Sequence, residues 1–158
     1  MTKFLLAVHV IAAIVAIGPV TVAASMFPPT ARKALAEPGD AQALATTRLL
    51  HRICRVYATV GVVVPVFGFA TASNMGVLGD AWLIVSIALT ALAAVVLAAL
   101  VLPRQAAIME GIEDAGGGEI AVTTRATARL AMFTGIFNLL WATVTVLMII
   151  RPGSTTGA

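Results

Sequence analysis

The stretch FLLAVHVIAAIVAIGPV, from Phe4 to Val20, decides what kind of protein this is. It contains no Asp, Glu, Lys or Arg, and the charge-free run that it opens continues to Ala31. About 20 helical residues cross the hydrocarbon core of a bilayer, so the run is long enough for a membrane-spanning helix. It also contains a histidine, His9, and the function depends largely on what that imidazole does.

Three further stretches have the same character. Of the 158 residues, 60% are hydrophobic and only 11% are charged, which is less charge than the surface of a soluble domain carries. The charge-free runs are Phe4–Ala31, Val56–Gly79, Ala81–Pro103 and Leu130–Ile150. Because a helix satisfies its own backbone hydrogen bonds in lipid, they predict an all-α integral membrane protein, a four-transmembrane-helix bundle. We expect one domain over residues 1–158, with spans at about 4–27, 56–79, 81–103 and 130–150.

The basic residues predict the orientation of the bundle. Eight of the ten lie in two of the three connections between spans: Arg32, Lys33, Arg48, Arg52, Arg55, Arg104, Arg125 and Arg129. Positive residues remain on the cytoplasmic side, so both termini should be extracytoplasmic. The basic residues of the chain then set its orientation in the membrane and attract anionic lipid headgroups, and they do not indicate nucleic-acid binding.

Helix breakers and caps divide the chain further. The pair Pro28-Pro29 predicts the end of the first helix, and Asp40 is placed to cap the next one. That second helix should run through the membrane to about Met75, with a bend at Pro65. The third helix should extend beyond its span to Ala115, and a turn at 116–118 should lead into the fourth. The bundle therefore gains cytoplasmic helical extensions.

Two groups of residues are candidates for contact with lipids or with partner subunits. Gly68, Ala72 and Gly76 form a stripe of small residues at spacing four, where another helix can approach closely. The stripe serves either packing within the chain or a partner subunit. The second group is basic and occupies single helix faces: Arg48, Arg52 and Arg55 on the second helix, and Arg125 and Arg129 before the fourth span.

The two histidines should lie on opposite sides of the membrane. His9 is near the extracytoplasmic end of its helix and His51 is at the cytoplasmic end of the second, so the hydrocarbon core separates them. One haem therefore cannot take both as axial ligands within a monomer. For His9 three readings remain open: packing between helices, a haem or metal ligand, and proton or ligand handling. No spacing of His, Cys or Met predicts a metal site.

Other polar groups are few. No Asp, Glu, Lys or Arg lies within a span, whereas proton-coupled carriers use such groups at mid-membrane. Asn138, about halfway across the fourth span, predicts a hydrogen bond between helices. Cys54 is the only cysteine, so no disulfide forms within the chain, and a buried unreactive thiol is expected. No catalytic motif is recognisable.

Several segments resemble a known family. The first helix with LLAVHVIAA, the entry RLLHRICRVYATVGVVVPVFG, the segment WLIVSIAL and the ending FNLLWATVTVLMIIRP are similar to the four helices of the CopD/HemJ-like superfamily. The similarity is greatest to its uncharacterised actinobacterial members, which are predicted integral membrane proteins. The resemblance implies a four-helix fold in a bacterial cytoplasmic membrane.

For the HemJ branch, the resemblance implies protoporphyrinogen oxidation with haem b. That branch uses the first-helix histidine, here His9, with a histidine and a lysine at the positions of Ile84 and Ser86. It also has an acidic residue where this chain has Leu139. The scaffold is similar, but these departures speak against the oxidase chemistry, and the CopD type of copper export lacks clustered His and Met.

The sequence therefore predicts a non-catalytic accessory subunit with no cofactor. Such a subunit stabilises or regulates a larger inner-membrane assembly, for which a lipid or small-molecule transporter is a suitable host. Its partners are membrane lipids, including anionic headgroups, and other membrane subunits. The alternative is a haem b- or metal-binding membrane redox protein that uses His9.

Overall fold

The computed structural model describes residues 2–114 and 120–153, without the side chains of residues 120–123. Its elements are α1 (Thr2–Ala36), α2 (Ala41–Val60), α3 (Val63–Met75), α4 (Ala81–Val95), the π-helix η1 (Val96–Val101), α5 (Leu102–Asp114) and α6 (Ile120–Ile150). Since α2 continues into α3, and α4 through η1 into α5, the chain forms long rods. In the described residues, four helices are long and apolar enough to cross a membrane, as predicted.

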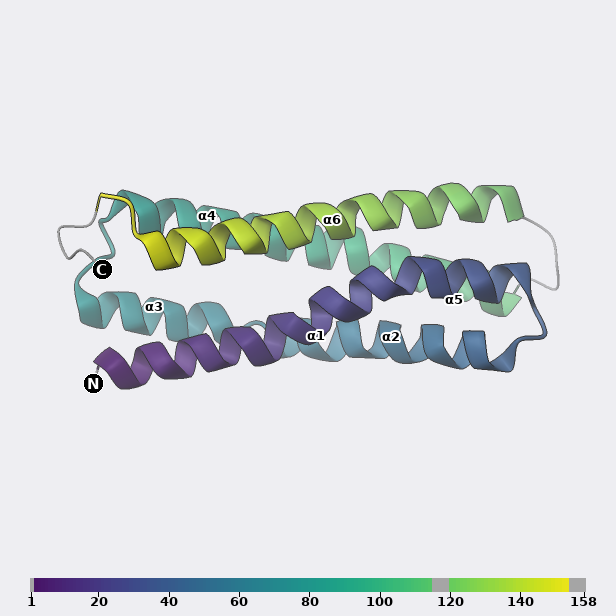
Figure 1. The fold of residues 1–158 in the computed structure, drawn as a ribbon, viewed down its shortest axis with the longest axis horizontal. Coiled ribbons are helices and arrows are strands. Elements are labelled where there is room, and N and C mark those ends of the chain that lie inside the picture. Colours follow the sequence, from purple (N-terminus) through teal and green to yellow (C-terminus); the bar gives the residue numbers. More distant parts are fainter. Residues whose placement is uncertain (1, 115–119, 154–158) are drawn as a thin grey trace.

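The rods run side by side and alternate in direction (Figure 1). The start of α1, the turn between α3 and α4, and the end of α6 lie at one end of the bundle. The turn between α1 and α2, the end of α5 and the start of α6 lie at the other end, which we call the charged end. Ala36 and Ala41 bound the turn there, and the basic residues from Arg32 to Arg55 lie on the two helices that the turn joins.

The rods are longer than the membrane is thick. At about 1.5 Å per residue, the 35 residues of α1 extend over about 52 Å, whereas the hydrocarbon core measures about 30 Å. The charge-free part of α1 begins at Phe4, close to its start, so the excess length projects at the charged end. The helical extensions predicted for the second, third and fourth helices are therefore present in α2, α5 and α6, and α1 adds one that the sequence does not predict.

The prediction that Pro28-Pro29 ends the first helix is wrong, because α1 continues to Ala36. A proline removes only its own N–H from the helix ladder, so the loss is local. The turn that contains the pair is packed tightly, with Phe27 and Ala31 fully buried and Pro28 buried as well. Tertiary burial thus keeps the backbone helical where the local sequence favours an end.

The second rod is interrupted at Gly61 and Val62, between α2 and α3. This break lies one turn before Pro65, whose ring would collide with the carbonyl of the residue four positions earlier, Gly61. The structure thus interrupts the rod one turn before the proline at which the sequence predicts a bend. The rod ends at Met75 as predicted, and Gly76 closes it with a φ of 72°, a left-handed conformation that suits glycine.

Two further terminations agree with the sequence and one feature is new. Asp40 caps α2, and α6 ends at Ile150 directly before Arg151. The π-helix η1 is not predicted by the sequence; it ends at Val101, two residues before Pro103, and its end carries a bond from the Leu102 N–H to the Leu97 carbonyl. The predicted glycine turn at 116–118 lies outside the described residues.

Small side chains let the rods approach closely. Alanines at 16, 23, 24, 31 and 93 are buried and surround a few large groups. The largest fully buried apolar side chains, Phe27, Phe137 and Leu130, belong to the main cluster, which extends to Ile108 and Met109 beyond the span. A smaller cluster, Ala72 with Trp82 and Leu83, fills the opposite end. The core therefore continues from the membrane into the extensions.

Candidate functional site

His9 joins α1 to α3. Its Nδ1 lies 3.0 Å from the carbonyl oxygen of Val64. Because a carbonyl only accepts, Nδ1 is the donor in this contact, and the tautomer that has its proton on Nδ1 keeps a lone pair on Nε2. The ring rests on Gly68, and its Cε1 stands 2.8 Å from the position that a Cβ at Gly68 would occupy. Only a glycine at position 68 leaves room for this imidazole.

The other two members of the small-residue stripe are also used within the chain. Ala72 is 5% exposed and packs with Trp82 and Leu83 of α4. Gly76 is the left-handed cap of α3, and a Cβ there would meet nothing within 4 Å. Packing within the chain, one of the two alternatives for the stripe, accounts for Gly68 and Ala72.

His51 and Cys54 meet a residue that the sequence did not single out. The side-chain amide of Gln105 bridges them. His51 Nδ1 donates to Gln105 Oε1 at 3.1 Å, and Gln105 Nε2 donates to Cys54 Sγ at 3.5 Å. Gln105 and Cys54 are fully buried. The signal for this network is the spacing of positions 51 and 54, one helical turn on one face, but nothing in the sequence pairs that face with position 105.

The structure keeps the two histidines far apart. The His51 ring centroid lies 6.3 Å from that of Phe27, and Phe27 is 18 residues beyond His9 on the same helix. At about 1.5 Å per residue, this places the histidines about 27 Å apart along the bundle. In the part of the chain that the structure describes, no three His, Cys, Asp or Glu residues are grouped for a metal ion.

Asn138 makes the interhelical bond that its position predicts. Its Nδ2 donates to Ser25 Oγ of α1 at 3.1 Å, and the Ser25 hydroxyl in turn donates a hydrogen bond to the Thr21 carbonyl oxygen at 2.7 Å. Two buried oxygens on the same stretch of α6, Asn138 Oδ1 and Thr134 Oγ1, have no hydrogen-bond partner. The α1–α6 seam therefore has polar groups at mid-membrane.

The predicted basic faces differ in how they are used. Arg48 Nε donates to Glu113 Oε1 at 2.9 Å and ties α2 to α5. The other four arginines, Arg52, Arg55, Arg125 and Arg129, are exposed, and among the described residues they make no hydrogen bond or ion pair. Among the described residues, no acidic side chain pairs with these four arginines.

One arginine outside those faces is held firmly. Arg104 Nη1 donates to the Leu100 carbonyl at 3.0 Å, and its guanidinium lies 4.4 Å from the centre of the Phe133 ring. The sequence showed Arg104 only as one of the orientation-setting cations. Its pairing with an aromatic ring on α6 depends on the tertiary structure.

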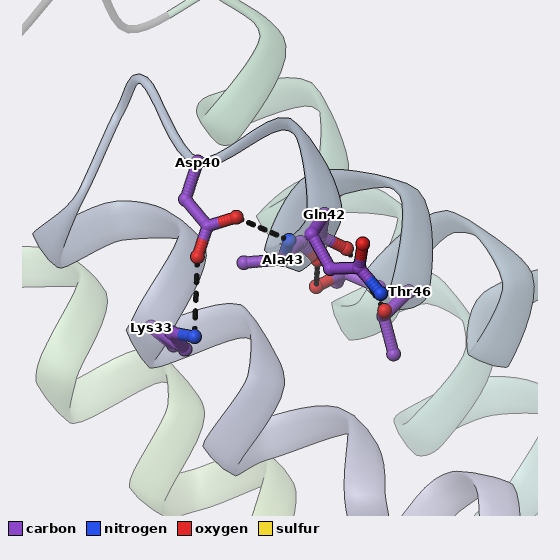
Figure 2. A network of polar contacts seen from close by, with 6 residues as sticks. Lys33, Asp40, Gln42, Ala43 and Thr46 are labelled. Carbon is purple, nitrogen blue, oxygen red and sulfur yellow. Dashed lines mark hydrogen bonds and ion pairs between the residues drawn. The ribbon is translucent and has the colours of Figure 1, made fainter.

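The turn at the charged end is fastened by Asp40 (Figure 2). One carboxylate oxygen accepts from the Ala43 N–H at 3.0 Å, and the other lies 3.1 Å from Lys33 Nζ. The hydrogen bond from Ala43 and the one from Lys33 stabilise the ionised form, so the pKa of Asp40 is lowered from its usual 3.8. This contact joins the last turn of α1 to the first turn of α2.

Comparison with known proteins places this geometry in a family. The family model described as "Predicted integral membrane protein (DUF2269)" matches residues 3–152, which is nearly the whole chain. Neither the curated proteins nor the solved structures give a match. The match includes all four membrane-spanning rods and the residues at positions 9, 68 and 105. The chain therefore belongs to the DUF2269 family of predicted integral membrane proteins.

Proposed function

We propose that this protein is a non-catalytic accessory subunit of a larger assembly in the bacterial cytoplasmic membrane, with its charged end in the cytoplasm. The observation that carries the proposal is the use of its reactive side chains. Hydrogen bonds of His9, of His51 with Cys54, and of Asn138 each join two helices of this chain. Groups that hold the helices together in this way stabilise a scaffold.

The outer surface of the bundle supports the same proposal. Large apolar side chains are exposed along the rods, among them Phe4 at 71% and Leu139 at 70%. Two glycines, Gly18 and Gly135, are exposed as well, and a Cβ at either would meet nothing within 4 Å. Gly18 lies two turns from Ser25 on α1, and Gly135 lies one turn from Asn138 on α6, so both border the exposed side of the α1–α6 seam. Small residues on an open seam allow a partner helix to pack closely.

The test is purification from native membranes in mild detergent, with partner stoichiometry measured by quantitative mass spectrometry. Wild-type protein should recover a membrane partner at close to one to one. Gly135→Leu should lose it, since a large side chain would block close approach at the seam. Gly111→Leu is the matched control, because Gly111 is open but lies in the α5 extension. Recovery of the chain alone, or equal recovery with Gly135→Leu, would refute the accessory role at this seam.

A second candidate function is haem b or metal binding by His9, and one observation favours it. A histidine whose Nδ1–H donates to a backbone carbonyl presents Nε2 to an axial or metal position, and His9 has this arrangement. The residues fit this only as a single ligand. Met75 lies seven residues beyond Gly68 on α3, about 10 Å along the rod from the His9 ring, too far to complete an axial pair.

The residue that would hold the group is therefore His9, and a bound haem would supply one-electron chemistry. The absorption spectrum of the purified protein decides between the two functions. A Soret band that His9→Ala abolishes would establish haem binding. A colourless, metal-free wild-type preparation would remove this candidate and leave the accessory role untouched.

A further inference from the structure

The strongest unexplained feature is the fixed position of Arg104. The side chain of an arginine at a membrane boundary is normally mobile, yet this one is held at two points, by the Leu100 carbonyl and by the Phe133 ring. Leu100 belongs to the π-helix η1, where the helix ladder is irregular. The guanidinium has five N–H donors, so one bond to a carbonyl leaves four of them for another acceptor.

A second arginine lies one helical turn from the ring that Arg104 covers. Arg129 precedes Phe133 by four residues on α6, so the two side chains occupy one helix face with about 5–6 Å between their Cβ atoms. Because Arg104 covers the Phe133 ring, both arginines border the same seam between α5 and α6. Arg129 is exposed, so it is accessible from outside the bundle.

These two positive charges are not neutralised within the described part of the chain. The ion pairs found there are Lys33 with Asp40 and Arg48 with Glu113, and neither involves Arg104 or Arg129. Two guanidinium groups on one seam repel each other, and an anion between them relieves that repulsion. The planar fork of arginine matches phosphate oxygens in pairs, which makes phosphate the best-suited anion.

The level of the pair in the membrane identifies the source of the phosphate. Arg104 directly follows the charge-free run that ends at Pro103, and Arg129 directly precedes the one that begins at Leu130. Both are thus the first charged residues outside their spans, at headgroup depth. Met132 and Ile136 follow Arg129 on the same face of α6, inside the span. They are 54% and 41% exposed and provide apolar surface for acyl chains.

We infer that Arg104 and Arg129 form a binding site for one anionic phospholipid, with the headgroup phosphate between the two guanidinium groups and the acyl chains along α6. Phe133 and the Leu100 carbonyl are positioning groups that orient Arg104. The site is independent of the accessory role, because it requires only the lipid bilayer in which this chain resides.

The experiment measures thermal unfolding of the full chain in nonionic detergent during titration with phosphatidylglycerol. Wild-type protein should be stabilised in a saturable manner, and Arg129→Gln should weaken the apparent affinity about fivefold, the contribution of one cation near a charged membrane surface. The matched control is Arg55→Gln. Arg55 is likewise the first cation outside its span and is exposed. In the described part of the chain, the arginines that lie over aromatic rings are Arg104 and Arg151, so no ring fixes a second arginine beside Arg55.

Further variants and probes separate the possible outcomes. Arg104→Lys keeps the charge and loses the fork, so it should also weaken binding, while its unfolding temperature without lipid reports on folding. Equal effects of Arg55→Gln and Arg129→Gln would overturn the site in favour of diffuse surface attraction. Equal stabilisation by phosphatidylcholine, or by inorganic phosphate alone, would overturn the assignment to an anionic lipid.

Discussion

The imidazole of His9 stands directly on the backbone of Gly68, with Cε1 2.8 Å from the place where a Cβ would lie. The contact holds α1 on α3 and lets Nδ1 reach the Val64 carbonyl one turn away. The histidine and the glycine are thus one structural unit, although they are 59 positions apart in the sequence.

Replacing Gly68 by alanine should destabilise the bundle. An alanine in an open helix position is favoured over glycine by about 0.5–1 kcal/mol, whereas overpacking a core costs about 1–3 kcal/mol. The collision should therefore outweigh the helix gain, and unfolding in a denaturing detergent titration should occur earlier. Gly135→Ala is the control, since its Cβ would meet nothing within 4 Å, and it should be neutral or stabilising.

The same substitution in a His9→Ala background separates the collision from other causes. Without the ring, Gly68→Ala should become neutral or stabilising, and the coupling between the two changes should fall within about 0.5–3 kcal/mol. An undiminished cost of Gly68→Ala in that background would contradict the role given to the contact.

Gln105 should be more important than any other neutral polar residue of the extensions. Gln105→Leu leaves the Nδ1 of His51 without its acceptor and the Cys54 thiol without its donor, next to a core that excludes water. Leaving buried polar groups unpaired costs about 1–3 kcal/mol, so the unfolding free energy should fall by that amount. Gln42→Leu, at an exposed position in the first turn of α2, is the control and should change stability little.

Asp40 should make the stability of the charged end depend on pH. Its pKa is lowered in the folded protein, so its contribution is present above the usual value of 3.8 and is lost as the pH falls through the lower, folded value. Wild type should therefore be more stable than Asp40→Ala at neutral pH, and the two should converge only below pH 3.8. Thermal unfolding from pH 7 to about pH 3 measures this difference. A gap that closes between pH 7 and pH 5 would contradict the assignment to this carboxylate.

The orientation of the bundle can be tested with two glycines in opposite turns. Gly39 and Gly79 lie at opposite ends, and a Cβ at either would meet nothing within 4 Å, so both accept a cysteine. In intact cells a membrane-impermeant maleimide should label Gly79→Cys and leave Gly39→Cys unlabelled until the cells are opened, because the positive-inside rule predicts that the charged end faces the cytoplasm. The native Cys54 is buried, so labelling of the wild-type chain measures the background of the experiment. The reverse labelling pattern would invert the proposed topology.

The number of spans and most of their ends could be read from the sequence, because each depends on local composition. Charge-free runs must be helical in lipid whatever they pack against, and the rods that include them are those of the structure. The Asp40 cap and the helix end at Met75 could also be predicted, because each depends on neighbouring residues. The Asp40 carboxylate accepts from the nearby Ala43 N–H, and Gly76 supplies the left-handed conformation after Met75. The sequence likewise placed the two histidines far apart.

Only the tertiary structure decided which side chains meet. The pairing of His9 with Gly68, of Gln105 with His51 and Cys54, and of Arg104 with Phe133 each depends on how two rods lie side by side and at what relative height. An apolar sequence determines neither the neighbour of a rod nor its relative height, because many rotations of a helix bury nearly the same apolar area in lipid. Burial of the turn around Pro28-Pro29 also keeps α1 helical there, although the local sequence favours the end of a helix. Local composition thus determined what crosses the membrane, and packing between rods determined what the polar groups do there.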